Sequence, residues 1–518
     1  MALAPLGGTE RGGGRRRGGE GARRVMAGTV LSGIMFFPRG GSAQVVRAQA
    51  RELERSGRHV TLVSGSRSDL GGHGDANAFY AGLDVRPVDF TPALGSTDPM
   101  AFAGPPGTAP MHPSYEDRPG AADRVMADLD DPAAERQVRA WVRELERAGA
   151  ARAAVLHLHH LTPLHEAAGR VAPGTPVVGQ LHGTELLMLE RIAEGAPPAW
   201  AATERWAQRL RGWADGCARL LVAPGGEERA AEALGLDTER FTPLPNGIDP
   251  DRFRHRPMDR SSFWRRQLVE DPQGWRPGGG PGSVRYTPEQ LEPLLGGTIL
   301  LCVGRFTSVK RLGPLLRAYA RARERFFGPA ALVLLGGHPD EWEDEHPIEV
   351  VEALGLTDVF LAGWHDHDEL PAFFSAADAT VMASIGDAFG QVLVEGMACG
   401  LPAVAVRALG PATILAGEKA GWLAEPDDEA SLVDALVAAV NGPEQRERRG
   451  GSAVTVARER YAWPAIGARL EAVLDEAVAA GGPGGRPATS SAGDGRPDRH
   501  PGGQRQARRP PPAPPELP

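Results

Sequence analysis

The chain has 518 residues, too many for one ordinary hydrophobic core and enough for two domains of roughly 200 residues each with tails. Hydrophobic residues make up 42% of it and charged residues 24%, as in a typical soluble protein. Its formal net charge is −9, and because the tails carry +4 and +3, residues 26–480 carry −16, which argues against nonspecific nucleic-acid binding and predicts no nucleic-acid partner.

At the amino end, residues 1–25 hold eight Gly and six Arg without an apolar period, so we expect them to be disordered. Met26 precedes the first strand-like run, and we expect it to be the true start of the protein. The sequence has no signal-peptide pattern and no run of about 18 apolar residues, which predicts a soluble, cytoplasmic protein.

A first series of alternating strands and helices begins with a strand at 29–37, a Pro-Arg-Gly-Gly-Ser loop and a helix that ends near residue 56. With a strand at 59–64, these elements form a β-loop-α-β unit, the building block of a parallel, doubly wound sheet. Residues 65–125 are rich in Gly, Pro and Asp, and we expect them to form long loops. Further strands are predicted at 154–158, 176–181 and 219–223, and further helices at 132–148, 198–214 and 227–234.

Regular structure stops where Pro and Asn-Gly occur within 241–249, which predicts an N-terminal domain at 26–254. The glycine-rich stretch 273–282 suits neither a helix nor a central strand, so we interpret 255–296 as an interdomain connection.

A second alternating series predicts a C-terminal domain at 297–460. A closing helix is expected at 464–478, within 461–480, and the Pro-rich residues 481–518 are expected to be disordered. The fold class is therefore α/β, with two Rossmann-like domains in tandem. The strands of the second series are predicted at 298–303, 331–335, 359–361, 379–382 and 403–406, and its helices at 311–327, near 348, at 369–376 and at 392–398.

The positions of the cysteines and lysines indicate which kinds of site the chain can form. Cys217, Cys302 and Cys399 lie far apart without a CxxC pair, which argues against a disulfide framework and a structural zinc site. Arg supplies nearly all the positive charge, and only Lys310 and Lys419 are lysines. Because the composition favours Arg so strongly, a functional role could explain why these two positions are Lys.

Residues 301–311 run from a strand through a turn to a helix start. Gly304 lets the backbone approach an anion, and Arg305 and Lys310 place positive charge beside a helix N-terminus, whose dipole also favours phosphate. A diphosphate suits this arrangement. A solvated turn with basic residues is the alternative for the turn alone.

Asp387 and Glu395 lie eight residues apart on either side of a strand-to-helix transition. Their carboxylates can accept hydrogen bonds from vicinal hydroxyls, as a polyhydroxylated ligand requires. By spacing alone, a loop acid followed by an acid in the first turns of a helix is the more common arrangement.

Together these segments resemble a known family. Residues 387–402 resemble the E-x7-E region of the retaining glycosyltransferases of family 4, whose GT-B fold has two Rossmann-like domains facing across a cleft. Residues 36–41 resemble the family's first glycine-rich loop, and 245–249 with Phe253 resemble its "PNGVD…F" segment. Val303, Gly304 and Arg305 with Lys310 resemble its "GR…K" diphosphate site. The resemblance covers most of residues 28–470, in the family's order.

The resemblance implies roles for matching positions. Arg305 and Lys310 would neutralise the donor diphosphate, and Glu395 would bind the ribose hydroxyls. Asp387 would lie where the family's first Glu contacts the donor sugar, but its side chain is one methylene shorter, which leaves donor identity and catalytic competence open. Gly396 replaces the family's usual Ala. The other implied donor-binding residues are Gly304, Phe389 and Gly390.

The N-terminal half supplies further candidates. His182 follows the strand at 176–181 and resembles the family's cleft histidine, which could touch the transferred sugar; a hydrogen-bonded loop His is the alternative. Gly40 and Gly41 offer backbone N–H groups to a phosphate of the donor or acceptor. Four histidines could form a metal cluster, but strand alternation is expected to send His157 and His159 to one face and His160 to the other. We therefore favour packing in the cleft or core and expect no metal. The members of such a cluster would be His157, His159, His160 and His165.

The resulting hypothesis is a metal-independent retaining glycosyltransferase that moves a sugar from a nucleoside-diphosphate sugar to an acceptor hydroxyl, without a cofactor. A dehydrogenase is disfavoured because no GxGxxG opens a helix. A sugar-nucleotide-binding protein without transfer activity and a GT-B glycoside phosphorylase are kept as alternatives. The base, the sugar and the acceptor are not identified, and peripheral membrane contact stays open although no basic amphipathic helix is found.

Overall fold

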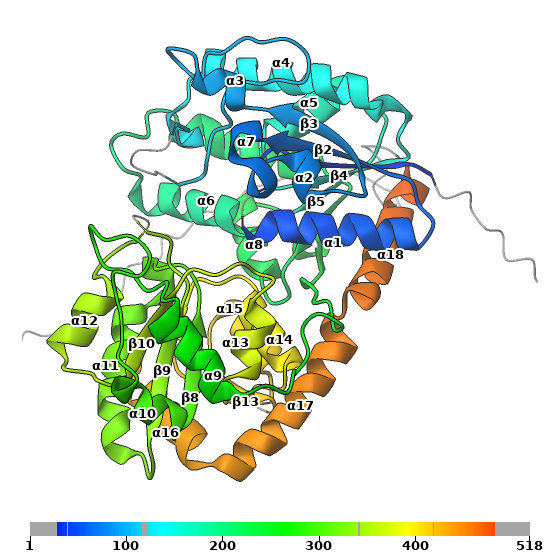
Figure 1. The fold of residues 1–518 in the computed structure, drawn as a ribbon. Helices are drawn as coiled ribbons and strands as arrows, with labels where there is room; N and C mark the ends of the chain where they lie inside the picture. Colours follow the sequence, from blue (N-terminus) through cyan, green and yellow to red (C-terminus); the bar gives the residue numbers. More distant parts are fainter. Residues whose placement is uncertain (1–27, 39, 117–121, 340–341, 418, 482–518) are drawn as a thin grey trace, which may run out of the picture. The chain divides into compact units, whose positions relative to one another are not determined.

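The computed structural model describes residues 28–38, 40–116, 122–339, 342–417 and 419–481. The described residues all belong to one compact unit. Our expectations for residues 1–25, Met26 and 482–518 lie outside the described residues. Two parallel sheets organise the chain in sequence order (Figure 1).

The first sheet has seven parallel strands in the order β3-β2-β1-β4-β5-β6-β7. Its central strands are buried along their whole length, as expected for apolar runs covered by helices on both faces. The strands are β1 (Val30–Ile34), β2 (Val60–Ser66), β3 (Asp84–Asp89), β4 (Val155–His159), β5 (Val177–Gln180), β6 (Arg219–Val222) and β7 (Phe241–Pro243).

Helices connect these strands. The main ones are α1 (Gly41–Arg55), α4 (Asp131–Ala148), α5 (Pro163–Val171), α6 (Thr184–Gly195), α7 (Thr203–Asp215) and α8 (Glu227–Leu234), with the short helices α2 (Ala76–Phe79) and α3 (Thr91–Leu94). In α1, one face is apolar and buried, with Val46, Ala50 and Leu53 among its residues.

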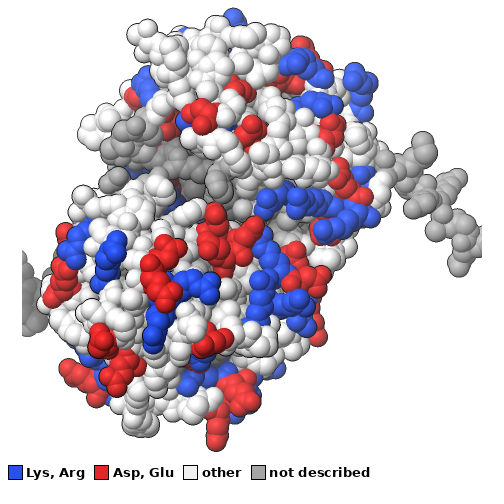
Figure 2. Space-filling view, in the orientation of Figure 1, with Lys and Arg blue, Asp and Glu red and all other residues white. Residues whose placement is uncertain are grey.

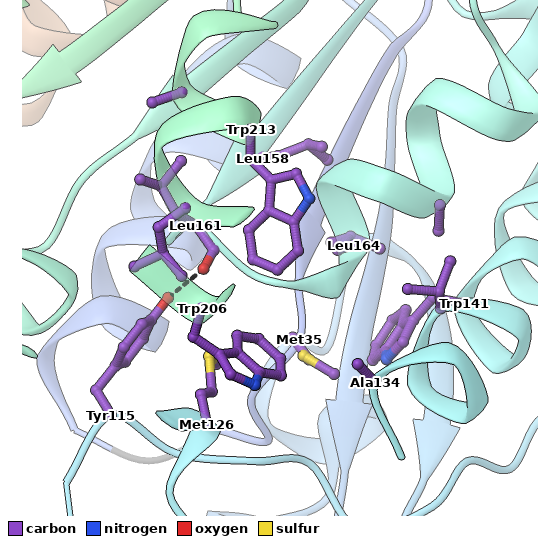
Figure 3. Packing of buried hydrophobic residues seen from close by; sticks show 14 of the residues in the cluster. Met35, Tyr115, Met126, Ala134, Trp141, Leu158, Leu161, Leu164, Trp206 and Trp213 are labelled. Carbon is purple, nitrogen blue, oxygen red and sulfur yellow. Dashed lines mark hydrogen bonds between the residues drawn. The ribbon is translucent and has the colours of Figure 1, made fainter. Parts of the chain in front are cut away.

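Our expectation that residues 65–125 form only loops is wrong in one important respect, because they contain the edge strand β3. Pro87 and the charged residues of Asp84–Asp89 hid this strand, but such residues are tolerated at a sheet edge. Tyr115, later in this segment, contributes to the core: it is buried and donates a hydrogen bond to the backbone O of Leu161 at 2.6 Å (Figure 3). Tyr115 therefore packs close to the end of β4.

The second sheet has six parallel strands in the order β10-β9-β8-β11-β12-β13. They are β8 (Thr298–Val303), β9 (Ala330–Leu335), β10 (Val359–Gly363), β11 (Ala379–Met382), β12 (Ala403–Val406) and β13 (Gly421–Ala424). The helices around it are α11 (Leu312–Ala322), α12 (Pro347–Ala353), α13 (Leu370–Ser375), α14 (Gln391–Ala398), α15 (Leu409–Ile414), α16 (Glu429–Asn441) and α17 (Pro443–Tyr461).

The connecting residues 255–296 pack onto the second sheet. They include α9 (Arg260–Arg265) and α10 (Glu292–Leu295), and Trp264 and Leu294 are fully buried in the same apolar cluster as strand β8. On the face shown in Figure 2, acidic and basic side chains are intermingled over this part of the molecule.

The helix expected at 464–478 is α18 (Trp463–Ala480), and it packs on the first sheet beside α1. Ile466, Leu470 and Leu474 join a buried cluster with residues of β1 and β2. Arg58 adds ion pairs to Glu471 and Asp475. In the part of the chain that the structure describes, no helix is both long and apolar enough to cross a membrane.

The strand order places the candidate residues. In each sheet, the first three strands are added outward in one direction, and the later strands are added on the other side of the first strand. This order puts β1 beside β4 and β8 beside β11. Ligands of open parallel sheets bind at the carboxyl ends of the strands where the order reverses. Gly40 follows β1, Arg305 and Lys310 follow β8, and Asp387 follows β11, so these residues lie at the two reversal points.

Candidate functional site

Lys310 and Asp387, predicted from separate motifs, contact each other. Lys310 ends a single 3-10 turn after β8, Ser308–Lys310, and Asp387 lies in the loop between β11 and α14. The Lys310 Nζ donates to Asp387 Oδ2 at 2.5 Å, and each side chain is 22% exposed. Partial burial reduces solvent screening, so this ion pair is stronger than one on the open surface.

The Asp387 carboxylate also holds the start of α14. Its Oδ1 accepts the backbone N–H of Gly390 at 2.8 Å and, at 3.4 Å, that of Phe389. Asp is favoured before a helix because its oxygens satisfy such unpaired donors. Asp387 is therefore fixed at one oxygen by the helix start and at the other by Lys310.

Arg305 lies beside this pair. It lines one small pocket together with Gly304, Lys310 and Ser384. Arg305 is exposed, and its guanidinium has no hydrogen bond or ion pair with any residue that the structure describes. Its five N–H donors are thus available to an anion held between the ends of β8 and β11.

Glu395 is almost fully buried in α14, with 1% of its surface exposed. Its Oε1 accepts hydrogen bonds from His367 Nε2 at 2.7 Å and from Gln391 Nε2 at 3.2 Å. Gln391 Nε2 also donates to the backbone O of Gly247 at 3.0 Å. The sequence analysis missed His367 and Gln391, although the i,i+4 spacing of Gln391 and Glu395 was a usable signal.

The two remaining residues of this segment have backbone roles. The Phe389 ring is buried against Tyr461, with ring centroids 5.7 Å apart, and its backbone N–H lies at the start of α14 beside Asp387. Gly390 is the N-terminal cap residue of α14 and has a φ of 88°.

His182, which follows β5, is half-buried and lies against a group of buried histidines in and after β4. Its ring Nε2 lies 3.1 Å from His159 Nδ1, and its ring centroid lies 4.3 Å from that of His160. The prediction that His160 points away from this group is wrong, because β4 ends at His159 and His160 has a φ of 60°. Strand alternation therefore does not extend to His160.

The carboxylate of Glu185 anchors this group. It is fully buried at the start of α6, where Oε1 accepts the His182 backbone N–H at 2.9 Å and Oε2 lies 3.4 Å from His160 Nδ1. Burial raises the pKa of Glu185, but His160, His182 and the backbone outweigh it and lower that pKa to about 2. Glu185 is therefore ionised at neutral pH, and the sequence analysis did not single it out.

Burial lowers the pKa of the surrounding histidines. The pKa of His157 and of His165 falls to about 4, and that of His159 and of His182 lies well below the usual range. These rings are neutral at physiological pH. Among the described residues, no group of three or more His, Cys, Asp or Glu is arranged to hold a metal ion.

The loop that carries His182 lies beside the loop that carries Asp387. A Cβ built on Gly183 would lie 3.2 Å from the Cβ of Ala388, and Gly183 has a φ of 99°, so a larger residue would be both strained and crowded there. The fold thus brings His182 close to the Asp387 loop, although the two residues are far apart in the sequence.

Gly40 and Gly41 lie at the start of α1. Gly40, with a φ of 75°, is the N-terminal cap residue and offers no side chain to the first turn. A Cβ built on either residue would meet nothing within 4 Å. No side chain caps the first turn of α1, and both glycines are exposed, which is compatible with the predicted phosphate or acceptor loop.

Comparison with known families matches both halves of the chain. The family described as "Glycosyltransferase Family 4" matches residues 39–252, and the family described as "Glycosyl transferases group 1" matches residues 287–454. The first match lies in the part of the chain that forms the first sheet, and the second match lies in the part that forms the second sheet. Both agree with the resemblance noted in the sequence.

Curated relatives carry a common name. A "D-inositol 3-phosphate glycosyltransferase 2" of Catenulispora acidiphila is 27% identical over 59% of this chain, and a "D-inositol 3-phosphate glycosyltransferase" of Corynebacterium diphtheriae is 32% identical over 38% of it. The chain spans 66% of the length of the first relative and 48% of the second, less than two thirds of each.

Solved structures match more of the chain. A sucrose-phosphate synthase from Thermosynechococcus elongatus gives a TM-score of 0.61 at 18% identity, covering 88% of this chain and 100% of that one. The Anabaena protein HepE, solved with UDP and glucose, gives 0.59 at 16% identity, covering 86% of this chain and 99% of that one. This likeness and the two parallel sheets confirm the predicted fold class, α/β of the GT-B type.

Proposed function

We propose that this chain, which belongs to the group 1 glycosyltransferases of family 4, is a retaining enzyme that transfers a sugar from a nucleoside-diphosphate sugar to an acceptor hydroxyl. The observation that supports this most is the Lys310–Asp387 ion pair at the ends of β8 and β11, with Arg305 beside it and Glu395 in the helix α14 that follows. The cations, Arg305 and Lys310, suit a diphosphate, and the carboxylate of Glu395 suits the hydroxyls of a ribose.

The electrostatic task is to stabilise negative charge that develops on the departing diphosphate. Arg305 and Lys310, near the helix start of α14, supply this stabilisation, and at the partly buried Lys310 it is stronger than in water. We propose that donor diphosphate displaces Asp387 from Lys310, so that the ammonium exchanges one anion for another. Asp387, still held by Gly390, is then free to accept a hydroxyl of the donor sugar.

In the proposed reaction, the bond between the sugar's anomeric carbon and the diphosphate oxygen breaks as the acceptor oxygen bonds to the same face of that carbon. The proton of the acceptor hydroxyl passes to the leaving phosphate oxygen, so the reaction needs no protein nucleophile. We propose that His182, whose neighbour Gly183 lies beside Ala388 of the Asp387 loop, contacts the transferred sugar. Because burial lowers its pKa, His182 acts there as a neutral hydrogen-bonding group.

We propose that transfer requires neither a metal ion nor a cofactor, because Arg305 and Lys310 supply the charge that a divalent cation would otherwise provide. Transfer activity that survives a chelator supports this part of the proposal. Activity that is lost with chelator and restored by one divalent cation contradicts it.

A second candidate is a protein that binds sugar nucleotides without transferring the sugar. It is favoured by one observation, that the shorter Asp387 replaces the family's Glu and is already engaged by Lys310 and the α14 start. In that case the carboxylate would not reach the sugar.

A binding screen followed by a turnover assay separates these candidates. Thermal shifts with UDP, GDP, ADP and their sugars identify the donor, because a ligand that binds the folded state raises its stability. The protein is then incubated with that donor and an acceptor panel that includes D-inositol 3-phosphate, since relatives carry that name. Acceptor-dependent nucleotide release with retained anomeric configuration supports the enzyme. Tight binding without turnover supports the second candidate, and phosphate-dependent glycoside breakdown without a nucleotide indicates a phosphorylase.

A further inference from the structure

His367 lies between an arginine and the buried carboxylate of Glu395. It follows β10 in the loop that leads to α13, whereas Arg252 lies in the segment that follows β7. Arg252 Nη2 lies 2.9 Å from His367 Nδ1, and His367 Nε2 lies 2.7 Å from Glu395 Oε1. Three segments far apart in the sequence thus form one chain of hydrogen bonds.

The partners determine the tautomer of His367. A guanidinium can only donate hydrogen bonds, so Nδ1 must accept the bond from Arg252 and carries no proton. The ring proton of the neutral imidazole then lies on Nε2, which donates to Glu395. Arg252 therefore selects the one tautomer in which the ring can hold the carboxylate.

Other contacts fix both ends of this chain. Arg252 also forms an ion pair with Asp368, and the His367 ring lies 5.2 Å from that of Phe253, centroid to centroid. At the other end, Gln391 donates to the same oxygen of Glu395 as His367 does. No donor among the described residues binds the second oxygen, Oε2. Glu395 is thus held by Oε1 and has Oε2 left for a ligand.

We propose that His367, with its tautomer set by Arg252, is a positioning residue that aims Glu395 Oε2 at a ribose hydroxyl of the donor. This inference rests on the proposed function, in which Glu395 binds the ribose. His367 is 33% exposed, so it does not serve mainly as packing for the core. Its effect is transmitted through Glu395, and it makes no contact with the reacting atoms.

The distinguishing measurement is the preference for ribose over deoxyribose. Dissociation constants are measured by calorimetry for UDP, GDP and ADP and for their 2′-deoxy and 3′-deoxy counterparts, with the wild type and variants. If Glu395 accepts a ribose hydroxyl, the wild type prefers the ribonucleotide by on the order of tenfold or more over at least one deoxy form. A loss of packing alone would weaken the binding of all these ligands equally and leave the ratio of their dissociation constants unchanged.

We expect His367→Ala to reduce this ratio to about threefold or less, and His367→Gln, which retains a donor near the position of Nε2, to restore part of it. Arg252→Gln leaves the imidazole but removes the charged donor to Nδ1, and we expect it to lower the ratio by a smaller factor. This variant tests the same role of His367 if His367→Ala does not fold. His255→Ala, an exposed histidine of the connecting segment, is the matched control and should keep the wild-type ratio.

The outcomes separate this inference from the proposed function. If Glu395→Gln abolishes the ribose preference but His367→Ala and Arg252→Gln keep it, the positioning role is wrong and the ribose site stands. If Glu395→Gln also keeps the wild-type ratio, or if no diphosphate binds the wild type, the proposed donor site is wrong and this inference falls with it.

Discussion

The ammonium of Lys310 and the carboxylate of Asp387 lie 2.5 Å apart at the carboxyl ends of two neighbouring strands, β8 and β11. The cation proposed to bind diphosphate is therefore neutralised by the acid proposed to bind the sugar until a donor arrives. An anion that binds Lys310 must compete with Asp387, and the competition links diphosphate binding to the freedom of the carboxylate.

Removal of the Lys310 ammonium should slow transfer. We expect Lys310→Ala to lower kcat/KM by an amount equivalent to about 3 kcal/mol, as for the loss of one preorganised contact to a developing charge. The measurement is the initial rate of nucleotide release with donor and acceptor. Lys419→Ala removes the only other lysine of the chain, an exposed one, and should behave as the wild type. Equal rates for both variants would contradict the role of Lys310.

Neutralisation of Asp387 should separate nucleotide binding from sugar transfer. Asp387→Asn keeps an oxygen for the Gly390 N–H but frees Lys310 from its ion pair. We therefore expect affinity for the bare nucleoside diphosphate to stay equal or rise, while discrimination between donor sugars and the transfer rate fall. Titration calorimetry with the diphosphate and rates with several donor sugars test this. An equal loss of affinity for every donor and for the bare nucleotide would refute it.

Glu185 should be needed for the arrangement around His182. Glu185→Gln removes the negative charge beside His160 and weakens the acceptor of the His182 N–H. We expect a loss of about 1–3 kcal/mol in the free energy of unfolding, as for a disturbed buried hydrogen bond, together with slower transfer. Chemical denaturation and the rate assay measure the two effects. Glu194→Gln, an exposed acid of the same helix, is the control and should change neither.

The buried histidines make stability depend on pH. Burial lowers the pKa of His157 and of His165 to about 4 in the folded state, below the value of about 6.5 expected in the unfolded chain. Between these values the unfolded state binds more protons, so stability falls as the pH falls, by up to about 1.4 kcal/mol per pH unit for each ring. Stability from these rings is fully present above about pH 6.5 and is lost progressively down to about pH 4.

Denaturant unfolding at several pH values between 4 and 7 measures this slope. His157→Gln removes one of the titrating rings while retaining a polar group that can meet Gln180. We expect a smaller decrease in stability per pH unit in this variant than in the wild type. Identical slopes would show that His157 does not contribute.

Sequence patterns predicted the parts of the fold with strong periodicity. The central strands and the amphipathic α1 were found because apolar runs and helical spacing mark buried elements. The edge strand β3 was missed because Pro87 and its charges break the pattern. Strands β7 and β13 were also missed, and both lie at the edge of their sheet. Each of these strands is short or lies at an edge, where burial constrains the sequence less.

The sequence motifs of the candidate site could be predicted, but the contacts between their side chains could not. Arg305, Lys310, Asp387 and Glu395 were recognised as members of known segments. The contacts of Lys310 with Asp387 and of His367 with Glu395 join residues 77 and 28 positions apart, and local spacing gives no information on such distances. The role of Glu185 was hidden for a similar reason, because its partner His160 comes from the loop after a different strand.

The most direct test of the account is whether Arg305 and Lys310 together bind the donor's diphosphate. Affinities of the preferred nucleoside diphosphate and of the matching nucleoside are measured for the wild type and for the double variant Arg305→Ala, Lys310→Ala. The account predicts that the wild type binds the diphosphate much more tightly than the nucleoside and that the double variant loses most of this advantage. A double variant that binds the diphosphate as tightly as the wild type would contradict it.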